Sequence, residues 1–155
     1  MFEMGTTLAM GTGLKVIMPP ADVDAFKTAL VGDFKSLTFK TCRVDVEKAS
    51  AREAGDLANI RRAIVEGGGF LKTNQLVIGA MKVWMAGEGR AALAALAAEE
   101  RATSKLLSGL ANLLYEQGKL VEAEPLYREA LCGRRRMLGN ENFSTLASIC
   151  IVFWM

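Results

Sequence analysis

The residue types that most often carry out catalysis are sparse in this chain and do not cluster. None of its 155 residues is a histidine, which excludes Ser-His-Asp and Cys-His catalysis, histidine-ligated zinc and the usual proton shuttle at neutral pH. The acidic pairs Asp22/Asp24 and Glu99/Glu100 have the chemistry for general acid–base work, but they fall on predicted helix surfaces, where solvated carboxylates are the better interpretation. The sequence therefore predicts no catalytic residue, no metal site and no cofactor, and we expect a protein that is not an enzyme.

Three glycine-containing stretches share only part of the pattern of a phosphate-binding loop. Residues 11–13 and the glycines at 67–69 lack the strand–loop–helix context of a dinucleotide site. Gly118-Lys119 is followed by Leu120, where a P-loop needs Ser or Thr. Flexible turns are the better interpretation of the first two, and Gly118-Lys119 is not a P-loop.

A compact basic run, residues 134–136, is a further candidate for chemistry. A solvated helix face is the favoured interpretation, because Glu129 and Glu141 are near in sequence. A contact with a phosphate or with an acidic peptide is the alternative.

Composition narrows the classes of partner. The 19 basic and 17 acidic residues give a net charge of +2, which offers no electrostatic reason to bind nucleic acid. Cys42, Cys132 and Cys150 form an odd, widely spaced set that fits reduced thiols and a cytoplasmic location. The uncharged run at residues 142–155 is shorter than the ~20 residues that cross a bilayer. Glu3 and Lys15 argue against a secretory signal, so we expect neither a membrane partner nor secretion.

The sequence of the N-terminal two thirds of the chain predicts a helical domain with a minor β element, which we call the leader. Residues 1–13 are expected to be disordered, and the leader domain extends over residues 14–101. Apolar residues at helical spacing predict one helix over residues 23–37 (Val23, Phe26, Leu30, Phe34 and Leu37). Residues 14–18 and the alternating residues 41–47 predict two short strands that pair across this helix.

Helices complete the predicted leader. Ser50 to Glu53 form a capping box, and the helix that it opens ends at the glycines 67–69. A helix from about Thr73 is apolar on two faces, so we expect it to be the buried centre of the leader core. Gly87 and Gly89 should break or bend it, and residues 90–101 should form a helix that runs close to or into the next one.

Residues 106–138 predict two amphipathic helices that meet at Gly118. Large and small residues alternate at helical spacing so that the helices can approach closely, with Leu107, Leu110, Ala111 and Leu114 on the first and Ala123, Tyr127 and Ala130 on the second. Pro125 lies near the start of the second helix, and Gly133 should weaken that helix. One hairpin of this size should not fold unsupported. We therefore expect the leader to pack on it, or further repeats to follow in a longer parent chain.

These spacings, together with GKLVEAEPLYREAL, RRRMLGNEN and STLAS, resemble a tetratricopeptide repeat (TPR) of the kinesin-light-chain type, in which the second helix is longer than usual. The His-Pro pair that is usual in the following turn of that family is missing here. The repeat region covers residues 102–155, with one complete repeat at 104–138 and the start of a second at 144–155. Phe153 falls where the small Ala111 stands 42 residues earlier. The resemblance implies a mostly α fold, an α-solenoid fragment that ends in a TPR antiparallel helix hairpin.

The resemblance also implies a function. It predicts a non-catalytic scaffold that binds an unidentified protein or peptide partner, with peptide-facing residues at Lys105, Ser108, Asn112 and Tyr115. A role as a motor adaptor is a narrower hypothesis, since the heptad coiled coil of kinesin light chains is absent from this sequence.

Two alternatives stay open. The leader could be a small ligand-binding or regulatory domain to which the repeat is appended; its polar pocket would gather Lys40, Arg43, Asp45, Arg61 and Arg62. The chain could instead be a truncated fragment of a longer repeat protein without independent activity.

Overall fold

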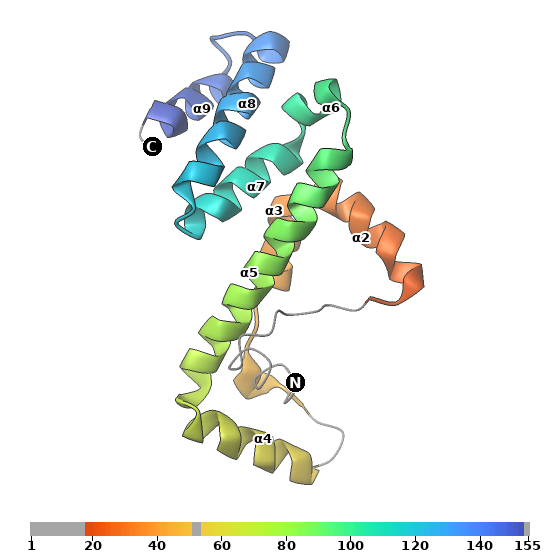
Figure 1. Cartoon of the computed structure of the whole chain (residues 1–155), viewed down its shortest axis with the longest axis vertical. Coiled ribbons are helices and arrows are strands. Elements are labelled where there is room, and N and C mark those ends of the chain that lie inside the picture. Colours follow the sequence, from red (N-terminus) through yellow and green to blue (C-terminus); the bar gives the residue numbers. More distant parts are fainter. Residues whose placement is uncertain (1–17, 51–53, 154–155) are drawn as a thin grey trace. The chain divides into compact units, whose positions relative to one another are not determined.

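The computed structural model describes residues 18–50 and 54–153, with the backbone alone at residues 54, 147 and 151–153 (Figure 1). In chain order its elements are α2 (Pro20–Gly32), α3 (Phe34–Thr41), the short 3₁₀ helix η1 (Val46–Lys48), α4 (Ala54–Glu66), α5 (Gly69–Ala95), α6 (Ala98–Thr103), α7 (Lys105–Glu116), α8 (Leu120–Leu138) and α9 (Phe143–Phe153). The described residues contain no strand, so the predicted mostly α fold is confirmed. Three predictions lie outside the described residues: the disordered N-terminus, nearly all of the strand at 14–18, and most of the capping box at Ser50 to Glu53.

The chain divides into two compact units, and α5 contributes to both. In the first unit, described for residues 39–50 and 54–84, α4 ends at a tight turn where Gly68 has a φ of +114°. This backbone conformation favours glycine, and the helix end predicted at the glycines 67–69 is confirmed. On α5, Val77 is buried, but Leu71, Leu76 and Val83 are exposed. The expectation that this helix forms a largely buried core is therefore wrong for its first part.

The strand predicted at residues 41–47 is wrong. The Asp45 carboxylate accepts a hydrogen bond from the Glu47 N–H (3.2 Å) and caps η1. The side-chain oxygen of Asn74 accepts from the Val46 N–H (2.9 Å), in the place of a strand partner. Cys42 and Val46 are buried all the same, because residues four apart can share one side of a turn as well as one face of a strand.

The predicted helix at 23–37 is real, but it is two helices. The chain leaves helical geometry at Asp33 (φ −148°, ψ 64°), between α2 and α3, and the Asp33 carboxylate accepts from the Ser36 N–H at the start of α3 (3.2 Å). A side chain that bonds its own downstream backbone competes with the continuous helical ladder. Leu30 and Phe34 on the predicted face are buried nonetheless.

The second unit holds residues 18–38 and 85–153 of the described chain, and the repeat lies within it. Here α2 packs on α7, α6 packs on α7 and α8, and α8 packs on both α7 and α9. Figure 1 shows α7 and α8 side by side as a hairpin, with α9 along the other side of α8. Leader residues and repeat residues thus share one compact body. The predicted boundary between residues 101 and 102 stays a prediction.

The Phe34 side chain packs between the leader and the repeat. It is 1% exposed, and its ring lies so close to Gly89 of α5 and Gly109 of α7 that a Cβ on either glycine would come within 2.9 Å of a ring atom. The ring therefore needs glycine at both positions. The close approach also explains why residue 89 of α5 is a glycine, and the break predicted at Gly87 and Gly89 is wrong, because α5 continues through both. The interruption falls later, between Ala95 and Ala98, so the prediction of one helix over residues 90–101 is wrong.

Candidate functional site

The turn between α7 and α8 makes the hairpin. Ser104 caps α7, since its hydroxyl accepts from the Leu106 N–H (3.1 Å). At the other end Gly118 has a φ of +73°, and the N–H groups of Gly118 and Lys119 donate to the carbonyls of Tyr115 and Leu114 (2.9 Å each). These two hydrogen bonds, together with a glycine in the left-handed region, form the Schellman motif. Gly118 is thus a turn residue, as the sequence indicated.

The facing surfaces of α7 and α8 pack through the alternation of large and small side chains. Seven residues were named for this packing, and each is 5% exposed or less: Leu107, Leu110, Ala111 and Leu114 on α7, and Ala123, Tyr127 and Ala130 on α8. The alanines let the two backbones approach, while leucines and tyrosine fill the space beside them. Pro125 lies in the second turn of α8, further into the helix than predicted.

Gly133, predicted to weaken α8, has a packing role that sequence reasoning missed. It is buried, and a Cβ there would lie 2.1 Å from the carbonyl oxygen of Ala102 at the end of α6. The backbones of α6 and α8 therefore meet where no side chain larger than hydrogen fits. The only signal in the sequence was a glycine in the middle of an otherwise helical stretch.

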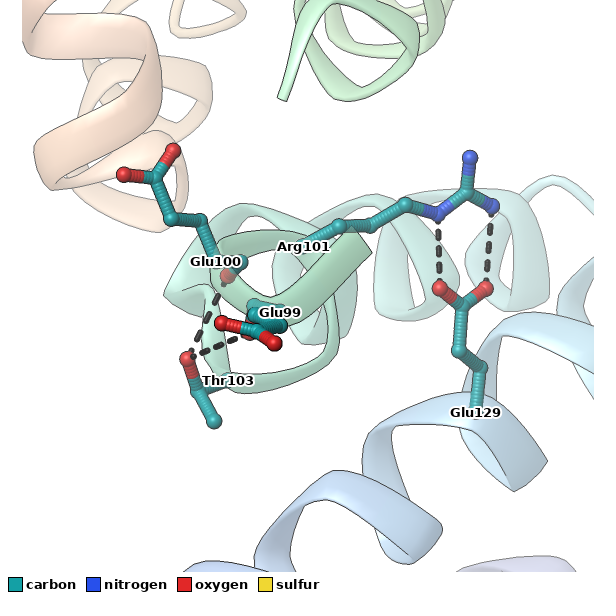
Figure 2. Close-up of polar contacts among 5 residues, drawn as sticks. All are labelled: Glu99, Glu100, Arg101, Thr103 and Glu129. Atoms are coloured by element: carbon teal, nitrogen blue, oxygen red, sulfur yellow. Dashed lines mark hydrogen bonds and ion pairs between the residues drawn. The ribbon is translucent and has the colours of Figure 1, made fainter. Parts of the chain in front are cut away.

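An ion pair holds α6 to α8 beside this contact (Figure 2). Arg101 Nε donates to Glu129 Oε1 (2.6 Å), and Arg101 Nη2 donates to Glu129 Oε2 (2.9 Å). The hydrogen bond with Glu129 raises the pKa of the Arg101 guanidinium. On α6 itself, the Thr103 hydroxyl donates to the backbone carbonyls of Glu99 and Glu100. The acidic pair Glu99/Glu100 is exposed, in line with its interpretation as a solvated surface.

The four predicted peptide-facing residues differ in exposure along α7. Lys105 is exposed, Ser108 and Asn112 are half-buried, and Tyr115 is 52% exposed. Successive members are three or four residues apart, so they share one side of the helix. The helix therefore presents a polar face with an ammonium group at its start and an aromatic ring at its end.

Asn112 is oriented by a residue of the second helix. The Tyr127 hydroxyl donates to Asn112 Oδ1 (2.5 Å). Burial, with smaller effects of Tyr115 and Glu116, raises the pKa of Tyr127 to about 12, so its hydroxyl keeps its proton at neutral pH. With the amide oxygen engaged, the Asn112 NH₂ group has no hydrogen-bond partner among the described residues.

Ser108 is likewise engaged from α8. Arg134 donates from Nη2 to Ser108 Oγ on α7 and from Nη1 to Ser148 Oγ on α9. The Ser148 hydroxyl donates in turn to the Ser144 carbonyl (2.8 Å). One half-buried guanidinium therefore joins α7, α8 and α9, and the basic run at 134–136 is not merely a solvated face.

The residues named for a ligand pocket in the leader do not converge in this way. Lys40, Arg43, Asp45, Arg61 and Arg62 are all exposed. Asp45 forms an ion pair with Lys48 (2.9 Å), and this hydrogen bond lowers the pKa of Asp45. Arg43 lies over the Phe39 ring, 5.7 Å from its centroid, and Arg61 donates to the Glu47 carbonyl (3.4 Å). These contacts account for three of the five without a ligand.

The described helices include none with the length and apolar character needed to cross a membrane. No disulfide joins Cys42, Cys132 and Cys150, which all belong to the part of the chain that the structure describes.

Comparison with known proteins bears on the hairpin. Residues 103–144 match a family model described as a tetratricopeptide repeat. The matched segment contains α7, α8 and the turn that leads into α9. No curated protein and no solved structure matches the chain significantly. The match supports a TPR protein, and a TPR suggests a protein–protein interaction module.

Proposed function

We propose that this chain binds a protein or peptide partner through the polar face of α7, formed by Lys105, Ser108, Asn112 and Tyr115, and that it works as a non-catalytic scaffold of the kinesin-light-chain type in the cytoplasm. The tetratricopeptide match of residues 103–144 supports an interaction module. The length of α8 supports the narrower type, since it has 19 residues against 12 in α7.

The observation that carries the proposal is the way Asn112 is held. Its oxygen accepts from Tyr127, so the hydroxyl fixes the orientation of the amide and leaves the NH₂ group to donate. A fixed amide donor can bond a peptide carbonyl without the entropy cost of ordering a mobile side chain. This supports a surface built to hold an extended peptide.

Lys105 supports the same assignment. It lies in the first turn of α7, where the helix dipole disfavours a positive charge. It forms no ion pair with any described residue, and no acidic residue shares that turn. A cation in this position contributes little to the helix, so a negatively charged partner would account for it.

Affinity capture with the intact chain tests the proposal. Asn112→Ala and Lys105→Ala should each lose the captured partner, while circular dichroism and the thermal unfolding midpoint stay close to those of the unchanged chain. Arg128→Ala is the matched control, because it also removes one exposed positive charge but lies on α8 and pairs with Glu124 (2.7 Å). Partner capture that survives both α7 substitutions would contradict the proposal.

A further inference from the structure

Apolar side chains gather at the corner where α8 turns into α9. Met137 and Leu138 end α8, and Phe143 begins α9 after the turn at residues 139–142. All three are exposed, and Phe143 is 84% exposed. A single exposed apolar side chain is common on protein surfaces, but several around one turn form a patch that usually meets another surface.

The first part of α9 has the reverse of the polarity expected for a helix that faces water. Thr145 is 0% exposed and Ser148 is 2% exposed, whereas Leu146 and Cys150 are exposed. Phe143, Leu146 and Cys150 are three and four residues apart, so they share one side of the helix. A helix on the surface of a globular protein normally turns its apolar side inward. The outward side of α9 therefore suits surroundings less polar than water.

Positive charge lies at the same corner. Arg135 and Arg136 belong to the last turn of α8, both are exposed, and neither forms an ion pair with a described residue. Residues 130–155 contain three arginines, one glutamate and no other charged residue, so their net charge of +2 equals that of the whole chain. Arginines at this end of α8 suit the helix dipole, but the dipole does not account for the exposed apolar side chains beside them.

An anionic lipid surface fits both features of the corner. Lipid phosphates attract arginine, and the boundary between headgroups and acyl chains accepts aromatic and aliphatic side chains. In a symmetric contact, a second copy of the chain would bring arginine close to arginine, and nucleic acid would bind the arginines but leave the apolar side chains in water.

The length of the uncharged run at residues 142–155 agrees with contact at a surface. A run of this length is too short to cross a bilayer, but it is typical of interfacial segments. The expectation of no membrane partner rested on crossing and secretion, and binding to a membrane surface requires neither.

We propose that the α8–α9 corner, formed by Arg135, Arg136, Met137, Leu138 and Phe143, attaches the chain to the anionic surface of a membrane. The three apolar side chains enter the headgroup boundary, and the two arginines bind lipid phosphates. The contact does not involve α7, so it goes beyond the proposed function and does not depend on it. A chain that also binds a partner through α7 would hold that partner at the membrane.

Sedimentation of the full chain with lipid vesicles tests the proposal. One vesicle preparation contains phosphatidylcholine alone, and in the other about a third of the lipid is phosphatidylserine. The chain should sediment with the second and stay in solution with the first. Binding should weaken severalfold when the salt concentration rises from ~0.1 M to ~0.5 M, because salt screens the attraction between arginine and phosphate.

Substitution of Phe143 tests the apolar part of the contact. Phe143→Gln should weaken binding to the phosphatidylserine vesicles about tenfold, because the ring no longer leaves water. Val121→Gln is the matched control, since Val121 is also exposed but lies in the first turn of α8, about 20 Å along the helix from Arg135. This variant should bind as the unchanged chain does.

Two charge variants should act in opposite directions. Arg135→Gln combined with Arg136→Gln should weaken binding about tenfold or more, because each basic residue near an anionic surface contributes about fivefold. Glu141→Gln removes the acidic side chain of the turn, so it should strengthen binding severalfold. All three residues are exposed, and circular dichroism and thermal unfolding should match the unchanged chain.

Several results would overturn the inference. They are equal binding to both kinds of vesicle, no binding to either, a loss in Phe143→Gln no larger than in Val121→Gln, and weaker binding by Glu141→Gln. A dimer in light scattering that Phe143→Gln abolishes, with no vesicle binding, would show that a second copy covers the corner. Asn112→Ala should bind vesicles as the unchanged chain does, so failure of vesicle binding and failure of partner capture through α7 are separate results.

Discussion

Replacing Gly133 by alanine tests the packing of the repeat in a way that helix propensity alone would misjudge. In an exposed helix, glycine to alanine stabilises by about 1 kcal/mol. At position 133, however, the new Cβ would lie 2.1 Å from the Ala102 oxygen and 2.7 Å from its carbonyl carbon. Non-bonded carbon atoms pack best at ~3.5–4.0 Å, so α6 or α8 must move by about 1 Å.

The size of the effect follows from two opposing contributions. Overpacking in a well-packed region costs about 1–3 kcal/mol, and a shift of α6 also disturbs the two-point contact of Arg101 with Glu129. After the gain in helix propensity, we expect Gly133→Ala to destabilise the chain by about 1–2 kcal/mol. Gly87→Ala is the matched control in the same unit. It changes an exposed glycine of α5 with nothing within 4 Å of the new Cβ, so it should stabilise by up to about 1 kcal/mol.

Urea unfolding followed by circular dichroism measures both changes. The two variants should move the unfolding midpoint in opposite directions, with the dependence on urea concentration unchanged. If Gly133→Ala stabilises the chain as much as Gly87→Ala does, then α6 does not pack on α8 as described.

Three further predictions concern side chains of the second unit. The pKa of Tyr127 is raised to about 12, from 10.0 when unfolded. The protonated hydroxyl therefore stabilises the fold fully below pH 10, and about 2–3 kcal/mol of folding free energy is lost as the pH rises through 12. Urea unfolding across this pH range should show a smaller loss of stability in Tyr127→Phe. Phe34→Ala should cost about 3–5 kcal/mol in a thermal or urea melt, because the ring is 1% exposed, whereas Phe39→Ala, at a side chain 66% exposed, should cost under about 1 kcal/mol. A double-mutant cycle on Arg101 and Glu129 should give a coupling of about 0.5–1 kcal/mol, because the contact is two-pointed but half-exposed.

A specific result would contradict each of these three predictions. The pH-dependent loss would be the same with and without the Tyr127 hydroxyl if burial did not favour its protonated form. Similar losses for Phe34→Ala and Phe39→Ala would remove the ring from the core. A coupling near zero would mean that the Arg101–Glu129 contact does not persist in solution.

The spacing of large and small residues along the chain predicted the hairpin, but it did not predict the contacts between distant segments. Large and small residues alternate along two helices that are adjacent in sequence, so the pattern can be recognised from the sequence alone. The residues are Leu107, Ala111 and Leu114 on the first helix and Ala123 and Tyr127 on the second. The same is true of Gly118, whose turn depends on neighbouring residues alone. Both features therefore follow from residues that are close together in the chain.

Close approaches between distant segments were not predictable in this way. Gly133 was judged by helix propensity, because nothing near it in sequence indicates that the Ala102 carbonyl contacts it. Gly89 and Gly109 need to be glycine only because Phe34, which is far from both in sequence, lies against them. The predicted strand at 41–47 failed for a related reason: alternation over a few residues also suits a capped turn, and the bond from Val46 to Asn74 decides between them.

The candidate site was predicted in part. The resemblance placed Lys105, Ser108, Asn112 and Tyr115 on one face of a helix, and their assignment to a partner stays a prediction. The bonds of Asn112 to Tyr127 and of Ser108 to Arg134 were missed, because the direction taken by a long side chain depends on tertiary packing. A basic run is usually a solvated surface, and only the contacts of Arg134 distinguish it from its exposed neighbours.

Site-specific photo-crosslinking in cells tests the central claim most directly, namely that the α7 face holds a protein partner. A photoreactive aromatic amino acid is placed at Tyr115 on this face, where the residue is 52% exposed, or at Arg128 on α8, where the side chain is 65% exposed. We predict a discrete crosslinked protein from position 115 that is absent from position 128 and is lost when Asn112→Ala is added. Equal crosslinking from both positions, or a crosslink from position 115 that persists with Asn112→Ala, would contradict the account.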